Sequence, residues 1–158
     1  MSYLTKFIIV FSSWFGNTRK VAEAIGRAVS QNEENQVLVK EIKEVDPKEV
    51  LDYDVILIGS PNHMGGPTRS AKKFIDELGK LDLKGKRGAV FDTYVRENVH
   101  VNKAVRKMTK RINQKVPGVK LIADGLSILV KGVRGPLAEG EIAKCEEFGN
   151  EISSQLDK

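Results

Sequence analysis

The chain of 158 residues is predicted to be an α/β protein, with a doubly wound, five-stranded parallel sheet and helices on both faces. Three observations indicate this class. Apolar runs alternate with segments of helical periodicity, the run Val55–Ile58 is apolar at every position, and no repeat or linker interrupts the alternation. Strands that are apolar on both faces are typical of the buried centre of a parallel sheet. We therefore expect one domain over residues 1–158.

The strands are recognised as short apolar runs that lie between turn-forming residues. The run Phe7–Phe11 comes first, and Val55–Ile58 marks the centre of the sheet. Between them, polar and apolar residues mix after residue 35, which is typical of an edge strand. The expected strands cover residues 6–11, 36–42, 53–59, 87–91 and 120–130.

The helices are recognised by apolar residues that recur every three or four positions. In the third helix, Ala104, Met108 and Ile112 share one face, and the Pro117-Gly118 pair ends it. In the last helix, Cys145 lies on an apolar stripe, so we expect its side chain to pack in the core rather than to take part in a reaction. The expected helices cover residues 17–30, 68–78, 102–116 and 137–156.

The composition argues against several classes of protein. No apolar run approaches the length of a membrane span, and the N-terminal residues lack the pattern of a signal peptide. One cysteine, Cys145, excludes an internal disulfide, and the presence of only two histidines argues against a multi-histidine metal site. We expect a cytoplasmic protein with no membrane contact and no bound metal.

The formal net charge of +5 is unevenly distributed along the chain. Residues 1–68 carry a net −2, residues 69–120 carry +10, and residues 121–158 carry −3. Such a surplus indicates either an acidic partner or a solvated lysine-rich face. Nucleic acid is not expected, because no aromatic residues interleave with these basic residues.

Three segments rich in Gly, Ser, Thr, Asn and aromatic residues taken together, residues 12–17, 60–67 and 92–101, follow the first, third and fourth expected strands. Ligands of such sheets bind beyond the carboxyl ends of the strands, so these loops are expected to form one site. The first loop offers hydroxyl groups and Gly16 in front of a helix N-terminus, which favours an anion such as phosphate. The alternative is an ordinary capped turn between a strand and a helix.

The first loop resembles the FMN-phosphate signature of the flavodoxin family, and every fixed position of the signature is filled: Phe11, Ser13, Gly16, Thr18, Ala22 and Ile25. The second loop resembles the family's segment beside the flavin ring, and the third occupies the place of the segment on the ring's other side. The resemblance covers nearly the whole chain and is closest to the short-chain class. It implies a flavodoxin-like strand order, 2-1-3-4-5, and FMN rather than FAD as the cofactor.

The resemblance also implies which residues bind FMN. Tyr94 is the expected aromatic partner of the flavin ring, and the Gly65-Gly66 pair is the expected place for a peptide that stabilises the semiquinone. Two departures from the family pattern are Trp14 and Phe15, which replace hydroxylic residues, and Asp92, which replaces a glycine. The expected cofactor-binding residues are Ser12, Ser13, Trp14, Phe15, Gly16, Asn17, Thr18, Ser60, Pro61, Asn62, His63, Met64, Gly65, Gly66, Asp92, Thr93, Tyr94 and Val95.

By this resemblance the protein is expected to be a monomeric electron carrier that has no catalytic residues of its own. Its expected partners are redox proteins, acidic ones in view of the basic middle third, such as a ferredoxin-like protein or a reductase. Two alternatives stay open. One is an NAD(P)H-dependent quinone or FMN reductase, and the other is a binding module that has lost FMN.

Overall fold

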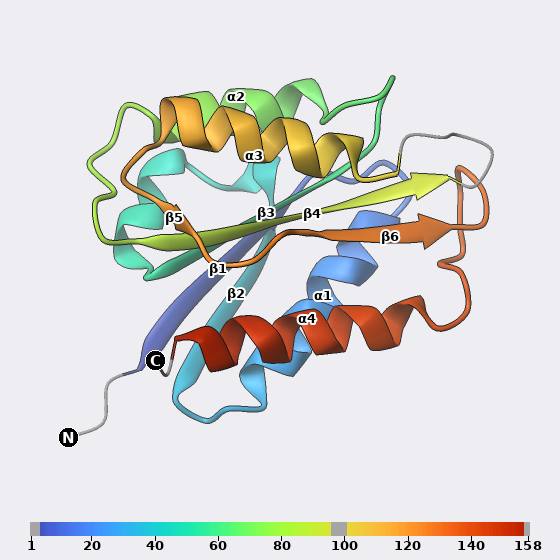
Figure 1. Cartoon of the computed structure of the whole chain (residues 1–158), viewed down its shortest axis with the longest axis horizontal. Coiled ribbons are helices and arrows are strands. Elements are labelled where there is room, and N and C mark those ends of the chain that lie inside the picture. The colour runs from blue at the N-terminus through green and yellow to red at the C-terminus, as the bar shows by residue number, and fades with distance from the viewer. Residues whose placement is uncertain (1–3, 96–100, 157–158) are drawn as a thin grey trace.

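The computed structural model describes residues 4–95 and 101–156, which build one parallel sheet between two pairs of helices (Figure 1). The strands are β1 (Thr5–Phe11), β2 (Asn35–Glu41), β3 (Val55–Pro61), β4 (Arg87–Val95), β5 (Lys120–Leu121) and β6 (Leu126–Val130). The helices are α1 (Asn17–Ser30), α2 (Arg69–Leu78), α3 (Lys103–Lys115) and α4 (Glu141–Gln155). Two short 3-10 helices, η1 (Ile42–Glu44) and η2 (Pro47–Asp52), connect β2 to β3.

The strand order is β2-β1-β3-β4-β5, with β6 also paired to β4, so the predicted order is confirmed. The edge position predicted for β2 is confirmed as well. The prediction of one continuous strand over 120–130 is wrong, because two segments share the fifth position. Between them Gly125 has a φ of +97°, which lies outside the β region and takes the chain out of the ladder.

β4 is longer than the sequence predicted. It runs to Val95 because β6 pairs with its second half, from Phe91↔Leu126 to Val95↔Val130. The expectation of a loop from residue 92 is therefore wrong for residues 92–95, and residues 96–100 lie outside the described part of the chain. α4 begins at Glu141 rather than at 137, because Gly140 before it is left-handed.

Each face of the sheet has its own apolar core. α2 and α3 cover the face that buries Ile8, Ile58, Ile75, Leu78 and Met108. α1 and α4 cover the opposite face, which buries Phe7, Phe11, Ile25, Phe91, Cys145 and Phe148. The predicted burial of Cys145 is confirmed, and burial raises the pKa of its thiol to about 12. None of the helices in residues 4–95 and 101–156 combines the length and the apolar character that crossing a membrane requires.

Candidate functional site

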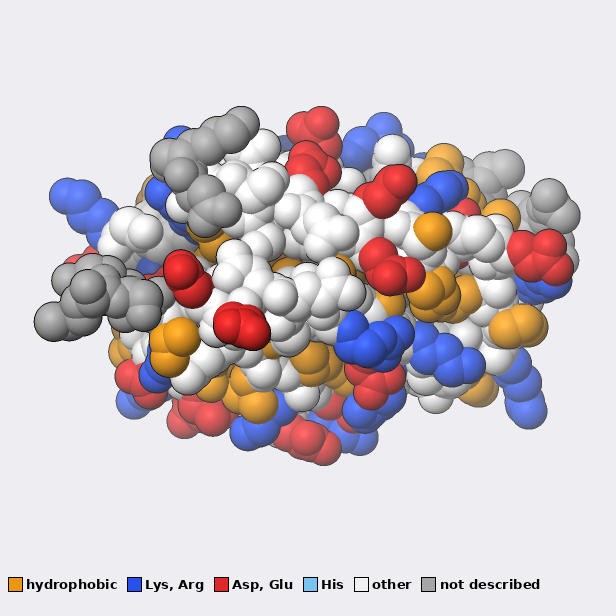
Figure 2. All heavy atoms as spheres, turned by 90° about the horizontal axis from the view of Figure 1, so that it is seen from below, with side chains coloured by type: hydrophobic (Ala, Val, Ile, Leu, Met, Phe, Trp, Pro, Cys, Tyr) orange, Lys and Arg blue, Asp and Glu red, His pale blue; other side chains and the backbone are white. Residues whose placement is uncertain are grey.

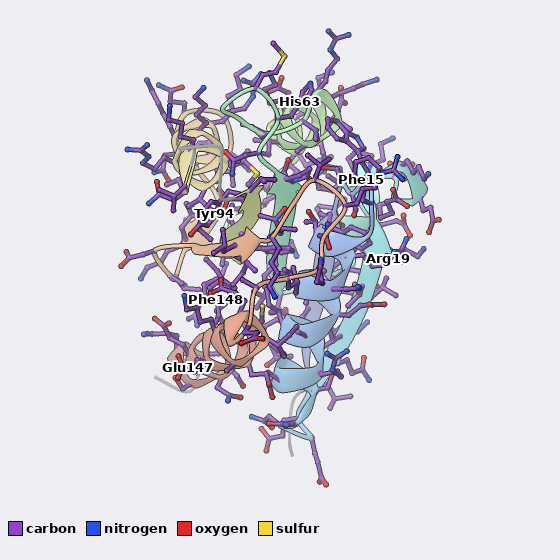
Figure 3. All side chains as sticks on the ribbon, turned by 90° about the vertical axis from the view of Figure 1, so that its right-hand side faces the viewer. Phe15, Arg19, His63, Tyr94, Glu147 and Phe148 are labelled. Atoms are coloured by element: carbon purple, nitrogen blue, oxygen red, sulfur yellow. The ribbon has the colours of Figure 1, made fainter. Side chains whose placement is uncertain are left out.

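A cavity of about 640 Å³ lies at the carboxyl ends of the strands, the edge of the sheet that faces the viewer in Figure 3. This size is typical of a small-molecule site. Its walls come from the segments after β1 and β3 and from the ends of β4 and β6. The lining residues are Ser13, Trp14, Phe15, Asn17, Thr18, Pro61, Asn62, His63, Met64, Thr93, Tyr94, Val95, Val130 and Val133.

The N-terminus of α1 forms one end of this cavity. Gly16 precedes the helix in a left-handed conformation, with φ of +85°, and its N–H donates to Ser13 Oγ at 3.0 Å. Within the described residues, the backbone N–H groups of Asn17, Thr18 and Arg19 donate a hydrogen bond to no acceptor. Free first-turn N–H groups and the helix dipole together favour an anion.

Asn17 strengthens this interpretation. It lines the cavity yet is only 7% exposed, and its side-chain amide has no hydrogen-bond partner in the described part of the chain. A buried polar group without a partner costs about 1–3 kcal/mol. A ligand that accepts from or donates to this amide removes that cost.

The hydroxyl groups around the site divide into two sets. Thr18 and Thr93 both line the cavity, and their hydroxyl oxygens lie 3.0 Å apart, so the first turn of α1 is joined to the end of β4. Ser12 and Ser60 instead lie behind the cavity wall, where both contact Thr68. Ser12 Oγ is 2.8 Å from Thr68 Oγ1, and Ser60 Oγ accepts the Thr68 N–H at 2.9 Å.

Aromatic side chains form the other walls. Tyr94 lies near the end of β4, and Phe15 comes from the first loop (Figure 3). Trp14 precedes Phe15 in the same loop. The Trp14 ring meets the His63 ring edge-on, with 4.6 Å between the ring centroids. Trp14 is 58% exposed, so this wall also faces solvent. Flat rings around an apolar cavity suit a planar aromatic ligand.

The second loop turns sharply between His63 and Gly66. His63 N–H donates to Gly66 O at 2.7 Å, and Gly66 N–H donates to His63 O at 3.1 Å. Met64 and Gly65 at the centre have φ values of +52° and +79°, which is the pattern of a type I′ turn. This turn projects Met64 outward, where it is 88% exposed.

Asp92 lies beneath the cavity and does not line it. Its carboxylate is fully buried and accepts hydrogen bonds from the Ser127 hydroxyl and, at 2.9 Å, from Val105 N–H. Burial raises the pKa of this carboxyl, and these hydrogen bonds oppose the rise. Beside it, Asn62 Oδ1 accepts Ala104 N–H at 2.9 Å. Together Asp92 and Asn62 cap α3, whose own N-cap residue makes no side-chain cap.

The structure brings most of the predicted residues to one place. Twelve of them line the cavity, whereas Ser12, Gly16, Ser60, Gly65, Gly66 and Asp92 lie next to it or beneath it. Val130 and Val133 also line it and were not predicted, because isolated valines at a strand end carry no recognisable signal. In the described ranges, no group of three or more histidine, cysteine or acidic residues is placed to hold a metal.

A family model described as Flavodoxin matches residues 9–147. A flavodoxin from Clostridium saccharobutylicum is 33% identical over 88 residues, which are 56% of this chain and 55% of that protein. An Archaeoglobus fulgidus protein named NAD(P)H dehydrogenase (quinone) is 31% identical over 116 residues, 56% of this chain and 61% of that protein. The chain thus spans little more than half the length of these relatives.

Solved structures match over nearly the full length. Oxidised flavodoxin 2 from Bacillus cereus superposes with a TM-score of 0.81 at 28% identity, covering 96% of this chain and 99% of that one. A flavodoxin from the domain Archaea gives a TM-score of 0.80 at 25% identity and covers 98% and 100% of the two chains. The arrangement of strands and helices around the cavity is therefore one that these proteins share.

Proposed function

The chain belongs to the flavodoxin family, and on that premise we propose that it binds FMN and carries electrons between redox proteins. The observation that carries this proposal is the polarity of the cavity. One end holds the N–H groups of the α1 first turn and the amide of Asn17, which have no partner in the described part of the chain, and the rest is lined by aromatic and apolar side chains. A ligand with one anionic group and a flat ring system fits both halves.

In this proposal the phosphate lies at the N-terminus of α1, where Ser13, Asn17 and Thr18 supply polar groups. Tyr94 near the end of β4 and Trp14 in the first loop hold the ring system between them and keep water from its faces. FMN is favoured over FAD because, among the described residues, one phosphate site of this kind lines the cavity. The bound flavin supplies the electron chemistry, and the protein supplies binding and orientation.

The test titrates apoprotein with FMN, riboflavin and FAD by flavin fluorescence quenching. FMN should bind at least tenfold more tightly than riboflavin, because riboflavin lacks the phosphate, and tenfold corresponds to about 1.4 kcal/mol. Equal affinity for FMN and riboflavin would remove the α1 N-terminus from the site. Tighter binding of FAD would contradict the choice of cofactor.

The Archaeoglobus relative motivates a second candidate, an NAD(P)H-dependent quinone or FMN reductase. Anaerobic mixing of the holoprotein with NADPH or NADH alone distinguishes the two. A carrier is reduced far more slowly than the order of 10 s⁻¹ at which a typical enzyme turns over. Reduction at that rate, followed by transfer to a quinone, would favour the reductase. A monomeric state and a cytoplasmic location stay predictions, and light scattering tests the first.

A further inference from the structure

A second hollow of about 680 Å³ adjoins the cofactor cavity, and we call it the basic groove. It lies between α2 and α3, and Trp14, His63 and Met64 line both it and the cavity. Figure 3 shows His63 on the α2 side of the site. The remaining lining residues of the basic groove are Gly66, Pro67, Arg69, Lys72, Lys107, Lys110, Arg111, Gln114 and Lys115.

The basic groove is positively charged along its length. Of its lining residues within 4–95 and 101–156, six are cationic and none is acidic. At its far end Asp76, which does not line it, pairs with Arg111 at 2.7 Å and Lys115 at 3.2 Å. The Arg111 guanidinium, chiefly through its hydrogen bond, lowers the pKa of Asp76 to about 2, so this carboxylate stays ionised. The end nearer the cavity carries the larger uncompensated charge.

Four cations account for that charge: Arg69, Lys72, Lys107 and Lys110. None of them forms an ion pair with another residue in 4–95 or 101–156. Lys107 lies along the turn of the second loop, since a Cβ atom added to Gly66 would stand 3.2 Å from Lys107 Cδ and 3.4 Å from its Nζ. Positive charge therefore reaches the loop that borders the cofactor cavity.

We propose that the basic groove is the docking surface for an acidic segment of the redox partner, an inference that rests on the proposed function. Trp14 and Met64 stand at the boundary between the basic groove and the cavity as large exposed apolar side chains. Aromatic residues and methionine are enriched in protein interfaces. An acidic partner thus meets opposite charge along α2 and α3 and an apolar contact at the cofactor.

The construction of the basic groove favours a protein segment over a small anion. Its uncompensated cations are exposed side chains on two helices, whereas a small-anion site uses converging backbone N–H groups. Exposed charges mainly accelerate encounter rather than tighten the complex, which suits the brief contacts of a carrier. The opposite face of the molecule, covered by α1 and α4, instead shows acidic and basic side chains interspersed (Figure 2).

The test compares two ferric haem acceptors, an acidic b-type cytochrome and a basic c-type cytochrome. Each receives one electron from the reduced holoprotein, so one Fe(III) becomes Fe(II) for each electron that leaves the flavin. Stopped-flow rates are measured between about 10 mM and 150 mM ionic strength, where the Debye length falls from about 30 Å to 8 Å. The rate to the acidic acceptor should fall at least tenfold, and the rate to the basic acceptor should not fall.

The decisive variant is the double substitution Lys107→Glu and Lys110→Glu. Its matched control is the double substitution Lys84→Glu and Lys120→Glu. Both lysines are exposed; Lys84 precedes β4 and Lys120 begins β5, so both lie at the amino ends of the strands, away from the cavity. Each pair of changes lowers the formal net charge from +5 to +1. At low ionic strength the first variant should slow transfer to the acidic acceptor at least tenfold, and the control less than threefold.

Binding provides a second readout that does not need electron transfer. When the oxidised holoprotein is titrated with the ferric acidic cytochrome, the backbone NMR signals of α2 and α3 should change their chemical shifts. These shift changes should be absent in the Lys107/Lys110 variant. Equal effects of both double variants, or rates indifferent to salt, would overturn the proposal. Saturable submillimolar binding of inorganic pyrophosphate to the basic groove, with no shifts from the cytochrome, would overturn it in favour of a small anion. FMN affinity measured on the same variants separates failure here from failure of the proposed function.

Discussion

Gly135 lies directly against the side-chain amide of Asn17, so that a Cβ atom added to the glycine would stand 2.4 Å from Asn17 Oδ1. Gly135 also has a φ of +95°, which other residues rarely adopt. The segment between β6 and α4 thus packs against the Asn17 side chain. This contact links a distant glycine to the expected phosphate site.

Gly135→Ala is expected to displace Asn17 and to lower FMN affinity at least tenfold. The strained backbone should also lower the free energy of unfolding of the apoprotein by about 1–2 kcal/mol. Fluorescence quenching measures the affinity, and urea unfolding measures the stability. Gly132→Ala in the same segment is the control, because its new Cβ meets nothing within 4 Å. Equal FMN affinities in the two variants would exclude a role for the Gly135–Asn17 contact.

Gly16→Val is expected to weaken FMN binding at least tenfold, about 1.4 kcal/mol. A Cβ atom at Gly16 meets nothing within 4 Å, so the cost comes from its φ of +85°, where a β-branched residue is an outlier. Gly140→Val is a close control, because Gly140 also precedes a helix, has a φ of +81° and lies in open space. Both variants should lose similar stability. Only the first should lose FMN affinity, and unchanged affinity there would separate this loop from the site.

Tyr94→Leu is expected to raise the dissociation constant of FMN about two- to twelvefold. This range corresponds to the 0.5–1.5 kcal/mol that paired aromatic rings contribute beyond area burial. Tyr53→Leu, before β3 at the other edge of the sheet, should leave the constant unchanged. Isothermal titration of the two apoproteins measures both values. An unaltered constant for Tyr94→Leu would mean that the ring system lies elsewhere in the cavity.

Asp92→Asn should change how stability depends on pH. Burial raises the pKa of the folded Asp92 above its unfolded value of about 3.9, so between the two values the native state holds the extra proton. Its contribution is fully present below the unfolded value and is lost as pH rises through the folded value. The free energy of unfolding of Asp92→Asn minus that of the wild type should therefore increase from about pH 4 towards pH 7.

Urea unfolding at several pH values measures this difference. Ser127→Ala provides a second check, since the Ser127 hydroxyl donates to the carboxylate and holds its pKa down. That variant should widen the window in which stability falls with rising pH. A difference between Asp92→Asn and the wild type that stays constant with pH would show that the carboxyl has an ordinary pKa.

Local patterns predicted much of this molecule. The bounds of α1 agree with its apolar periodicity, and the strand order follows from the family resemblance. The first loop could be recognised because strand, glycine and helix are contiguous in the chain. By contrast, the division of the fifth strand depends on Gly125, where a Cβ would stand 2.5 Å from Val105 in α3. A close approach between distant segments leaves no periodic signal.

The roles of individual polar residues were harder to predict for the same reason. Ser12 and Ser13 are neighbours in sequence, yet Ser12 is bonded to Thr68 and Ser13 lines the cavity. Asp92 was expected at the cofactor, but β6 extends the sheet past it and directs its carboxylate to Val105 N–H in α3. The basic surplus of residues 69–120 was visible in the sequence. Its concentration between α2 and α3 depends on how the two helices pack.

Because Asp92 and Asn62 cap α3, different residues anchor this helix and form its charged outer face. Its first turn is anchored to residues that follow β3 and lie in β4, while its charged side chains face outward along the basic groove. The charged residues on the outer face of α3 can therefore be exchanged to change partner choice, while Asp92 and Asn62 are kept. Loss of Asp92 and Asn62 would instead release the first turn of α3, and its charged surface would lose its fixed distance from the cofactor.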